Sequence, residues 1–291
     1  MSGKKVAVVT GAIKGIGLAI ARSFARRGLI CVLSYYDWAE SIDEMKREMD
    51  AAGGDYLPVP VDLTDPSGAR VLVDAAMDRY GRLDVLVANI ERGGWPVVHG
   101  PYTDEQWRIE WDTTVTAKWR LFRESLSHMK REGGGTVVVV SSIAGLVGRS
   151  GPAGRVFPDC YSLANRAIGS LTETWAREGA PEVRVNELML GFVETRHGPG
   201  TRGWGLLSPK DQGSILSHTL LGRTGRLDEV ARAVDFLVFD AHFMTGSVLR
   251  MDGGYVLGGD PAVPVLRGVV RGEEPSHGGE LAPGLRQGTR G

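Results

Sequence analysis

The stretch Thr10-Gly11-Ala12-Ile13-Lys14-Gly15-Ile16-Gly17 follows the short apolar segment Val6–Val9 and opens the amphipathic segment 18–27. This order predicts a strand, a glycine-rich turn and a helix. Glycines let the backbone approach a phosphate closely, and the amides and positive dipole end of the helix start attract its negative charge. The stretch therefore predicts a site for the pyrophosphate of a dinucleotide. The alternative is a glycine-rich turn that binds no ligand.

Short apolar runs alternate with longer runs of helical period along the rest of the chain. The predicted strands are 6–10, 30–34, 57–61, 85–88, 136–141, 183–190 and 248–251. The predicted helices include 15–27, 41–52, 65–80, 104–130, 161–177 and 227–239. Alternation of this kind predicts the α/β class: βαβ units with right-handed crossovers, which build a doubly wound parallel sheet. Ligands of such sheets bind beyond the carboxyl ends of the strands.

Composition limits the class of protein and its partners. The chain has 291 residues, and 34 Lys and Arg balance 35 Asp and Glu to a net charge of −1, so nothing favours a nucleic acid or an anionic membrane as partner. Cys31 and Cys160 are too few for a disulfide framework and lack metal-ligand spacing, so no metal is expected. No signal peptide or membrane span is recognisable, which predicts a cytoplasmic protein. We expect one Rossmann-type domain over 1–258 and a disordered tail over 259–291, where Gly and Pro recur and periodicity is lost.

Several further motifs, in a fixed order, resemble the short-chain dehydrogenase/reductase family, in the subgroup of the 3-oxoacyl-carrier-protein reductases. The resemblance covers roughly 4–258. The motifs are Thr10 to Gly17, Val61-Asp62-Leu63-Thr64, Leu83-Asp84-Val85-Leu86-Val87, Ser141-Ser142-Ile143-Ala144-Gly145, Tyr161, Gly191-Phe192-Val193-Glu194-Thr195, Gly222-Arg223, Met244-Thr245-Gly246 and Met251-Asp252-Gly253-Gly254-Tyr255.

The resemblance implies a nicotinamide dinucleotide cofactor. In that family Asp62 would bond the adenine, Asn89 would lie beside the adenosine ribose, and Val193 with Thr195 would hold the carboxamide end. For Asp62 and Asn89 the alternative is a polar strand end that closes a turn. The full set of candidate cofactor-binding residues is Gly11, Ile13, Lys14, Gly15, Ile16, Gly17, Tyr36, Asp37, Asp62, Leu63, Asn89, Tyr161, Asn165, Gly191, Val193 and Thr195.

The family's chemistry uses a tyrosine, a lysine four residues later, a serine and an asparagine. Ser142 and Tyr161 match the serine and the tyrosine, but Asn165 stands at the lysine position and Thr114 at the asparagine position. A tyrosine has a pKa near ~10, and a cation close by lowers it towards neutrality. Asn165 carries no charge, and Arg166 is turned by about 100° around the helix. If no other cation substitutes, proton transfer by Tyr161 is expected to be slow near neutral pH.

Three other departures from the family lie near the same site. Glu91 places an anion where the family has a glycine, and Leu190 replaces a proline before Gly191. Tyr161 also lies further from Ser142 than in the family, and the extra residues fall within 148–160. This insertion is expected to border the mouth of the site; the alternative is a surface loop. The loop 197–220, with Gly198-Pro199-Gly200 and Trp204, is expected to form a lid or, again, a surface loop.

The choice of cofactor depends on the end of the second strand. An acid there accepts hydrogen bonds from the adenosine 2′-hydroxyl and repels a 2′-phosphate. The position expected for that acid holds Tyr35, with Asp37 two places on, and Lys14 could meet a 2′-phosphate. Lys14 favours NADP, and Asp37 keeps NAD open.

Three functions remain open. The first is an NAD(P)-dependent oxidoreductase acting on a carbonyl or a secondary alcohol, with Ser142 and Tyr161 at the substrate oxygen and Asn165 orienting the ribose. The second is a non-catalytic subunit that binds a dinucleotide or pairs with an active paralogue. The third is non-redox chemistry, such as dehydration or isomerisation, in the pocket that the family uses for its substrate. In each case the protein is expected to form a dimer or tetramer, or a hetero-oligomer.

Overall fold

The computed structural model describes residues 3–91, 103–195, 204 and 207–259. The chain divides at Gly259 into two units, 1–259 and 260–291. The second unit, and with it the expected disordered tail, lies outside the described residues. So does the Gly198-Pro199-Gly200 part of the expected lid.

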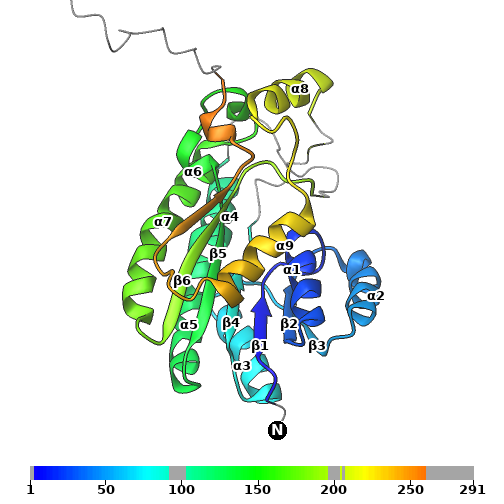
Figure 1. Ribbon diagram of the computed structural model, residues 1–291, viewed down its shortest axis with the longest axis vertical. Coiled ribbons are helices and arrows are strands. Elements are labelled where there is room, and N and C mark those ends of the chain that lie inside the picture. The colour runs from blue at the N-terminus through cyan, green and yellow to red at the C-terminus, as the bar shows by residue number, and fades with distance from the viewer. Residues whose placement is uncertain (1–2, 92–102, 196–203, 205–206, 260–291) are drawn as a thin grey trace, which may run out of the picture. The chain divides into compact units, whose positions relative to one another are not determined.

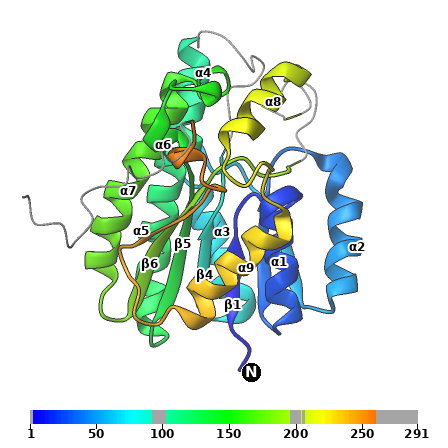
Figure 2. The ribbon, with the colours of Figure 1, turned by 45° about the horizontal axis from the view of Figure 1, so that its top comes forward.

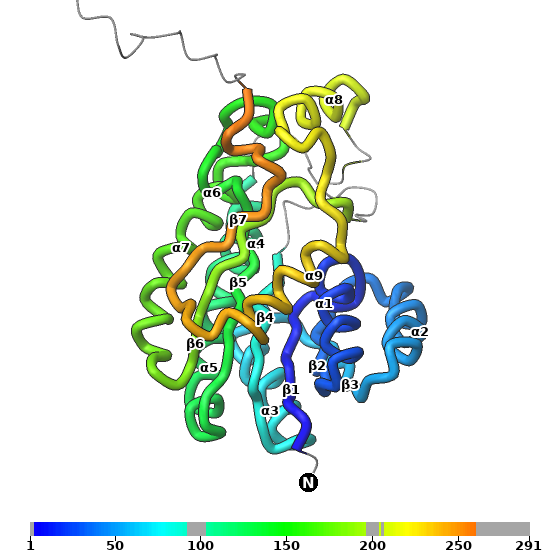
Figure 3. The backbone as a smooth tube through the Cα atoms, in the orientation of Figure 1, coloured from blue at the N-terminus to red at the C-terminus, as the bar shows by residue number. Residues whose placement is uncertain are grey.

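Seven strands form one sheet in the order β3-β2-β1-β4-β5-β6-β7, and every pairing is parallel (Figure 3). The strands are β1 (Val6–Val9), β2 (Ile30–Tyr35), β3 (Tyr56–Pro60), β4 (Val85–Ala88), β5 (Gly135–Ser142), β6 (Val183–Leu190) and β7 (Val248–Met251). The predicted doubly wound parallel sheet is therefore confirmed. Each predicted strand is present, with its ends shifted by no more than one residue.

Helices cover both faces of this sheet (Figures 1 and 2). They are α1 (Gly15–Arg26), α2 (Ile42–Ala52), α3 (Gly68–Tyr80), α4 (Asp104–Trp111), α5 (Ala117–Arg131), α6 (Ala144–Val147), α7 (Asp159–Gly179), α8 (Pro209–His218) and α9 (Leu227–Asp235). One apolar core joins α1, α2 and α9 to the sheet, and a second joins α3, α5 and α7 to the opposite face. Alternate strand residues serve the two cores: Val138 and Val140 face the first, and Val137 and Val139 the second.

Three predicted helices differ from the observed ones. The segment 104–130 is split by a π-helical turn, Asp112–Thr116, between α4 and α5. The helix expected from 65 begins at Gly68, because the Asp65 carboxylate accepts from Ser67 N (2.7 Å) and closes a separate turn. The third, 227–239, passes into a π-helical turn, Phe236–Asp240. A capping box of Thr103 and Gln106 marks the start of α4.

Helix α8 was not expected, because its residues fall in the segment assigned to a loop. Its local signal is nevertheless ordinary: Ser208 Oγ accepts from Asp211 N (3.2 Å), and a proline stands at the first helical position. In Figures 1 and 2, α6 and α8 lie beyond the carboxyl ends of the strands. This is the end of the sheet at which ligands of the architecture bind.

The close packing of α1 on the glycine turn makes Gly17 a test of the fold. A Cβ at Gly17 would lie 2.3 Å from the Gly11 carbonyl oxygen, which is backbone and cannot rotate away. We expect Gly17→Ala to lower the free energy of unfolding by about 1–3 kcal/mol, measured by chemical denaturation. Gly213→Ala in α8 is the control, because its Cβ meets nothing within 4 Å, and a gain of about 0.5–1 kcal/mol is expected there. Equal effects of the two variants would contradict this account of the turn.

Candidate active site

The glycine turn has the geometry expected of a phosphate cradle. Gly11 and Gly15 have φ values of +61° and +57°, which few other residues adopt without strain. The turn is fixed to β2, since Ala12 N donates to Ser34 O (3.0 Å). The first hydrogen bond of α1 runs from Leu18 N to Lys14 O (3.4 Å), so the amides before Leu18 precede the helical ladder. Those amides and the helix dipole suit an anion.

Lys14 lies over an aromatic ring beside this turn. Its ammonium is 2.9 Å from the centroid of the Trp38 ring, and Trp38 itself adopts a left-handed backbone with φ of 65°. Burial lowers the pKa of Lys14, while the nearby carboxylates of Glu40 and Asp37 act in the opposite direction. The cation that sequence reasoning assigned to a 2′-phosphate is thus held by Trp38 close to two acids. Tyr36, which directly precedes Asp37, is exposed.

Asp62 bonds within its own turn, whereas Asn89 bonds to the backbone of the glycine turn. The Asp62 carboxylate accepts from Thr64 N (2.9 Å) and Thr64 Oγ (2.7 Å). Asn89 Nδ2 donates to Thr10 O (3.0 Å), which ties the end of β4 to the glycine turn. Asp62 therefore closes a turn and Asn89 links two strand ends, and the contact of either side chain with a cofactor stays a prediction. Leu63 beside them is buried.

At the end of β6, Gly191 has no room for a side chain, because a Cβ would lie 2.6 Å from Asp252 Cα. Gly191 N also donates to Met251 O (2.9 Å). Val193 then forms an isolated β-bridge to Gly225, and the chain after β6 thereby crosses the carboxyl end of the sheet. The described segment ends at Thr195.

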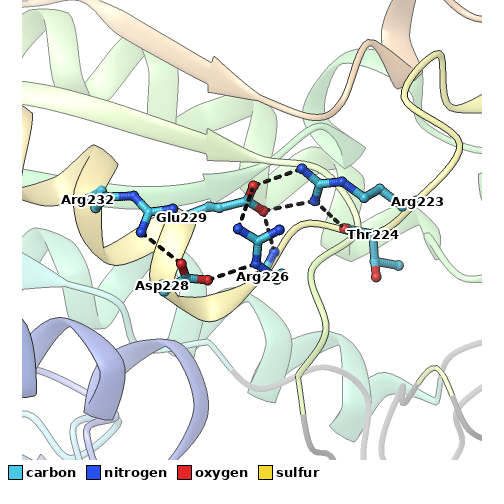
Figure 4. A network of polar contacts seen from close by, with 6 residues as sticks. All are labelled: Arg223, Thr224, Arg226, Asp228, Glu229 and Arg232. Atoms are coloured by element: carbon cyan, nitrogen blue, oxygen red, sulfur yellow. Dashed lines mark hydrogen bonds and ion pairs between the residues drawn. The ribbon is translucent and has the colours of Figure 1, made fainter.

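The segment opposite Val193 is fixed by an ion-pair network at the start of α9 (Figure 4). Glu229 accepts two hydrogen bonds from Arg223 (2.8 and 2.9 Å) and one from Arg226 N (2.8 Å). The bonds from Arg223, followed by that from the Arg226 backbone, lower the pKa of Glu229 to about 2. This carboxylate therefore stays charged at all physiological pH values, and the loop that meets Val193 is held independently of pH.

Ser142 and Asn165 meet at the end of β5. Ser142 N donates to Asn165 Oδ1 (2.9 Å), and Asn165 Nδ2 donates to Tyr161 O (3.0 Å), so the two expected site residues of α7 are joined to the serine. The Asn165 side chain is fully buried, and both bonds go to the backbone. Asn165 was expected to reach the ribose hydroxyls; that contact stays a prediction, and the structure shows a different set of partners. Arg166 is exposed, as the helical rotation predicts.

The insertion 148–160 forms the wall behind Tyr161. Phe157 is buried, and its ring centroid lies 5.7 Å from that of Tyr161 and 5.4 Å from that of Phe192. The Tyr255 hydroxyl accepts a hydrogen bond from Ala153 N (2.7 Å), which fixes the backbone of the insertion. The insertion therefore packs on the site and is not a detached surface loop.

Thr114 lies in the π-helical turn between α4 and α5, a distortion often found at functional sites. It is fully buried, and its hydroxyl donates to Glu110 Oε1 (3.4 Å). The turn packs against α7, the helix of Tyr161, but no described hydrogen bond joins Thr114 to Ser142 or Tyr161.

Lys118 is a site residue that sequence reasoning missed. It follows Thr114 by one helical turn, is fully buried, and its Nζ donates to Val140 O (2.7 Å) on β5. Burial lowers its pKa to about 8, while the carboxylates of Glu91, Glu187 and Glu110 act to raise it. The spacing Glu110, Thr114, Lys118 places three polar side chains on one helical face, a signal that was available in the sequence.

Glu187 is a second buried charge that was missed. It lies in β6 at a register position shared with Val183 and Val185, so it faces the core formed with α5 and α7. Its Oε1 accepts a short hydrogen bond from Ser141, and its Oε2 is buried without a partner among the described residues. Burial raises the pKa of Glu187, against the effects of the Ser141 hydroxyl and of Lys118. A carboxylate on the strand face that Val183 and Val185 share was the available signal.

The described part of the chain has neither a metal-binding cluster nor a membrane-spanning helix. No group of three His, Cys, Asp or Glu side chains there could hold a metal ion. Within the same residues, no helix is long and apolar enough to cross a membrane. Both cysteines are buried thiols, and burial raises the pKa of Cys31 to about 12.

Residues 11–256 match the family model described as enoyl-(acyl carrier protein) reductase. The chain is 35% identical to cis-4-hydroxycyclohexanecarboxylate dehydrogenase of Sinomonas cyclohexanicum, over 87% of this chain and 96% of that one. It is 38% identical to granaticin polyketide synthase putative ketoacyl reductase 2 of Streptomyces violaceoruber, over 86% and 95%.

Among solved structures, it resembles the NADPH-dependent 3-quinuclidinone reductase from Rhodotorula rubra, with a TM-score of 0.75, 26% identity, and coverage of 88% of this chain and 92% of that one. Sheet, glycine turn and sequence agree, and the chain belongs to the short-chain dehydrogenase/reductase family, with a ketoacyl reductase among its relatives.

Proposed function

We propose that this protein is an NAD(P)-dependent oxidoreductase that interconverts a carbonyl and a secondary alcohol through an atypical site. The observation that carries the proposal is the hydrogen bond from Ser142 N to Asn165 Oδ1. It joins the end of β5 to α7 one turn from Tyr161, which supports a site that uses the Ser142 and Tyr161 hydroxyls. The relatives named as a dehydrogenase and a ketoacyl reductase support the same reaction class.

The residues present fit a dinucleotide. Gly11 and Gly15 have the positive φ that a close backbone approach needs, and α1 directs its amino end at the same place. Gly17 leaves no space for a side chain between helix and turn. When bound, the nicotinamide supplies or accepts the hydride. In this proposal Val193 and Thr195 hold its carboxamide end.

Ser142 and Tyr161 act on the substrate oxygen. Ser142 Oγ accepts from Ala144 N (3.1 Å), which fixes the oxygen and directs the hydroxyl hydrogen away from that amide, towards a substrate carbonyl. Tyr161 gives its phenolic proton to that oxygen during reduction and takes it back during oxidation. Asn165 acts as a positioning residue, because it holds the backbone of both groups.

A second candidate function is a subunit that binds the dinucleotide without turnover and pairs with an active paralogue. One observation favours it: α7 presents the neutral, fully buried Asn165 one turn from Tyr161, where the family resemblance implies a lysine. The two candidates differ in turnover but not in cofactor binding.

Cofactor binding is tested at Gly15. Its Cβ position is open, and both Asp and Asn tolerate a left-handed backbone. We expect Gly15→Asp to weaken NADPH binding by at least about tenfold relative to Gly15→Asn, because only the aspartate repels phosphate. Binding is measured by the fluorescence of the reduced nicotinamide, and circular dichroism confirms that both variants fold. Equal affinities of the two variants would refute the phosphate site.

The proton-transfer role is tested at Tyr161. We expect Tyr161→Phe to lower turnover by about 10²–10⁴-fold with cofactor affinity unchanged, in an assay of NAD(P)H oxidation against a panel of carbonyl compounds. For the wild type, the rate of alcohol oxidation should rise with pH, since the tyrosinate is the proton acceptor. Undiminished turnover in the Phe variant would sink the mechanism. Binding without turnover in the wild type would favour the second candidate.

The cofactor preference is tested at Lys14. We propose NADP, supported by this lysine at the glycine turn and by the NADPH-dependent relative; Asp37 supports NAD. Lys14→Ala is expected to weaken NADPH binding by about tenfold, the loss of one charge-assisted contact, and to leave NADH binding nearly unchanged. Asp37→Asn should instead weaken NADH binding relative to NADPH binding. Loss of NADH and NADPH affinity to the same extent would exclude Lys14 as the selecting residue.

A further inference from the structure

Strand β4 ends before its neighbour β5, and this leaves two backbone groups of β5 facing an open gap. Even-numbered residues of β5 point their amides at β4, since Thr136 N donates to Asp84 O (2.9 Å). Ala88 is the last β4 residue in the register and pairs with Val139. The Val140 carbonyl and the Ser142 amide leave β5 on the β4 side, and therefore face the space past Ala88.

The described residues directly after β4, 89–91, do not fill this gap. Asn89 N and Ile90 N both donate to Thr10 Oγ (2.9 Å each), so the backbone turns away towards the glycine turn. Two side chains from the helices take the place of the missing strand. Lys118 Nζ donates to Val140 O, and Asn165 Oδ1 accepts from Ser142 N. A full positive charge is thus buried two residues from the site serine, on the same side of the same strand.

The groups that face this ammonium come from every element around it. Glu110 lies on α4, Glu91 follows β4, and Glu187 lies on β6; all three carboxylates act on the charge of Lys118. Glu187 is fully buried and has an unpartnered Oε2. From β5 the Ser141 hydroxyl binds the other oxygen of Glu187.

The burial of Lys118 is costly, although its ammonium also gives the Val140 carbonyl a partner. An ammonium taken out of water loses its hydration, and one carbonyl replaces only part of it. Lys118 is fully buried, whereas Lys130, on the same helix, reaches the surface and pairs with Glu182 (3.6 Å). The position of Lys118 therefore points to a role in the site.

We propose that Lys118, held on the carbonyl of Val140 in the gap beyond β4, supplies the positive charge of this site and stabilises negative charge on the oxygens at Ser142 and Tyr161. Glu187, with Ser141, is its buried counter-charge. The inference rests on the proposed oxidoreductase function. Lys118 is a positioning residue here: it acts on other groups through its charge and transfers no proton itself.

The first test observes Lys118 without any turnover. With ¹³C-labelled lysine, NMR follows the Cε signals against pH, and Lys118→Met identifies the signal of Lys118 by its loss. We expect a midpoint near 8 for the Cε signal of Lys118. Glu187→Gln should lower that midpoint, because it removes a carboxylate that favours the charged lysine. A midpoint below the pH of the activity assay would overturn the proposal, because Lys118 would then carry no positive charge there.

The coupling to the site is tested with the two forms of the cofactor. The oxidised nicotinamide is a cation and the reduced one is neutral, while their phosphates are identical. If Lys118 acts on the site, its midpoint should lie lower with the oxidised form bound than with the reduced form, since like charges disfavour each other. Equal midpoints would overturn the proposal even if the protein has no measurable turnover.

The effect on the reaction is read from the pH profile. Lys118→Met should move the rising limb of alcohol oxidation to higher pH by about one unit or more, with cofactor affinity unchanged. Lys130→Met, the matched control on α5, should leave the profile unchanged. Lys118→Met with Asn165→Lys, which moves the cation to α7, should bring the limb back towards its wild-type position.

The failures of the two proposals can be told apart. A wild type that binds cofactor but turns over no substrate refutes the proposed function, and the cofactor-dependent NMR midpoint still decides whether Lys118 acts on the site. A wild type with turnover whose pH profile is unchanged by Lys118→Met refutes the inference and leaves the proposed function standing. If Lys118→Met fails to fold, the pH profile of Glu187→Gln decides. A lower pKa of Lys118 in that variant must also move the rising limb of alcohol oxidation.

Discussion

The early end of β4 is the constraint on which the site depends. A buried carbonyl or amide without a partner costs about 1–3 kcal/mol, and β5 continues past its neighbour with one of each, at Val140 and Ser142. Since backbone cannot fill the gap, side chains of α5 and α7 must reach in. Lys118 and Asn165 do so. The same two bonds that satisfy β5 therefore fix the helices that carry Thr114 and Tyr161.

This origin explains why the fold follows from the sequence more directly than the site does. Strand and helix periodicity act over a few residues, so β4, β6 and β7 are predicted to the residue. The π-helical turns, Asp112–Thr116 and Phe236–Asp240, are not predicted by the helical period of the apolar residues. Helix α8 is missed for another reason: its polar, weakly periodic residues are typical of a loop, and only its cap at Ser208 marks its start.

The site residues divide in the same way. Ser142 and Tyr161 come from motifs in which the local sequence is enough, and the structure brings their backbones together through Asn165. Apart from Glu110, the groups around Lys118 lie on β5, on β6 and after β4, far from it in sequence. No local pattern predicts that these elements meet at one point. A polar residue on an apolar strand face, such as Glu187, indicates a buried group. It does not indicate which residues lie next to that group.

The charges in the buried cluster oppose one another in an informative way. Burial lowers the pKa of Lys118 and raises that of Glu187, so desolvation pushes both groups towards their neutral forms. Their mutual attraction favours the charged forms, and Ser141 adds to this by bonding the carboxylate. The charge state of Lys118 therefore depends on the groups around it. A buried cation in that condition responds to any new charge in the site, whereas an exposed one, screened by water and salt, would respond very little.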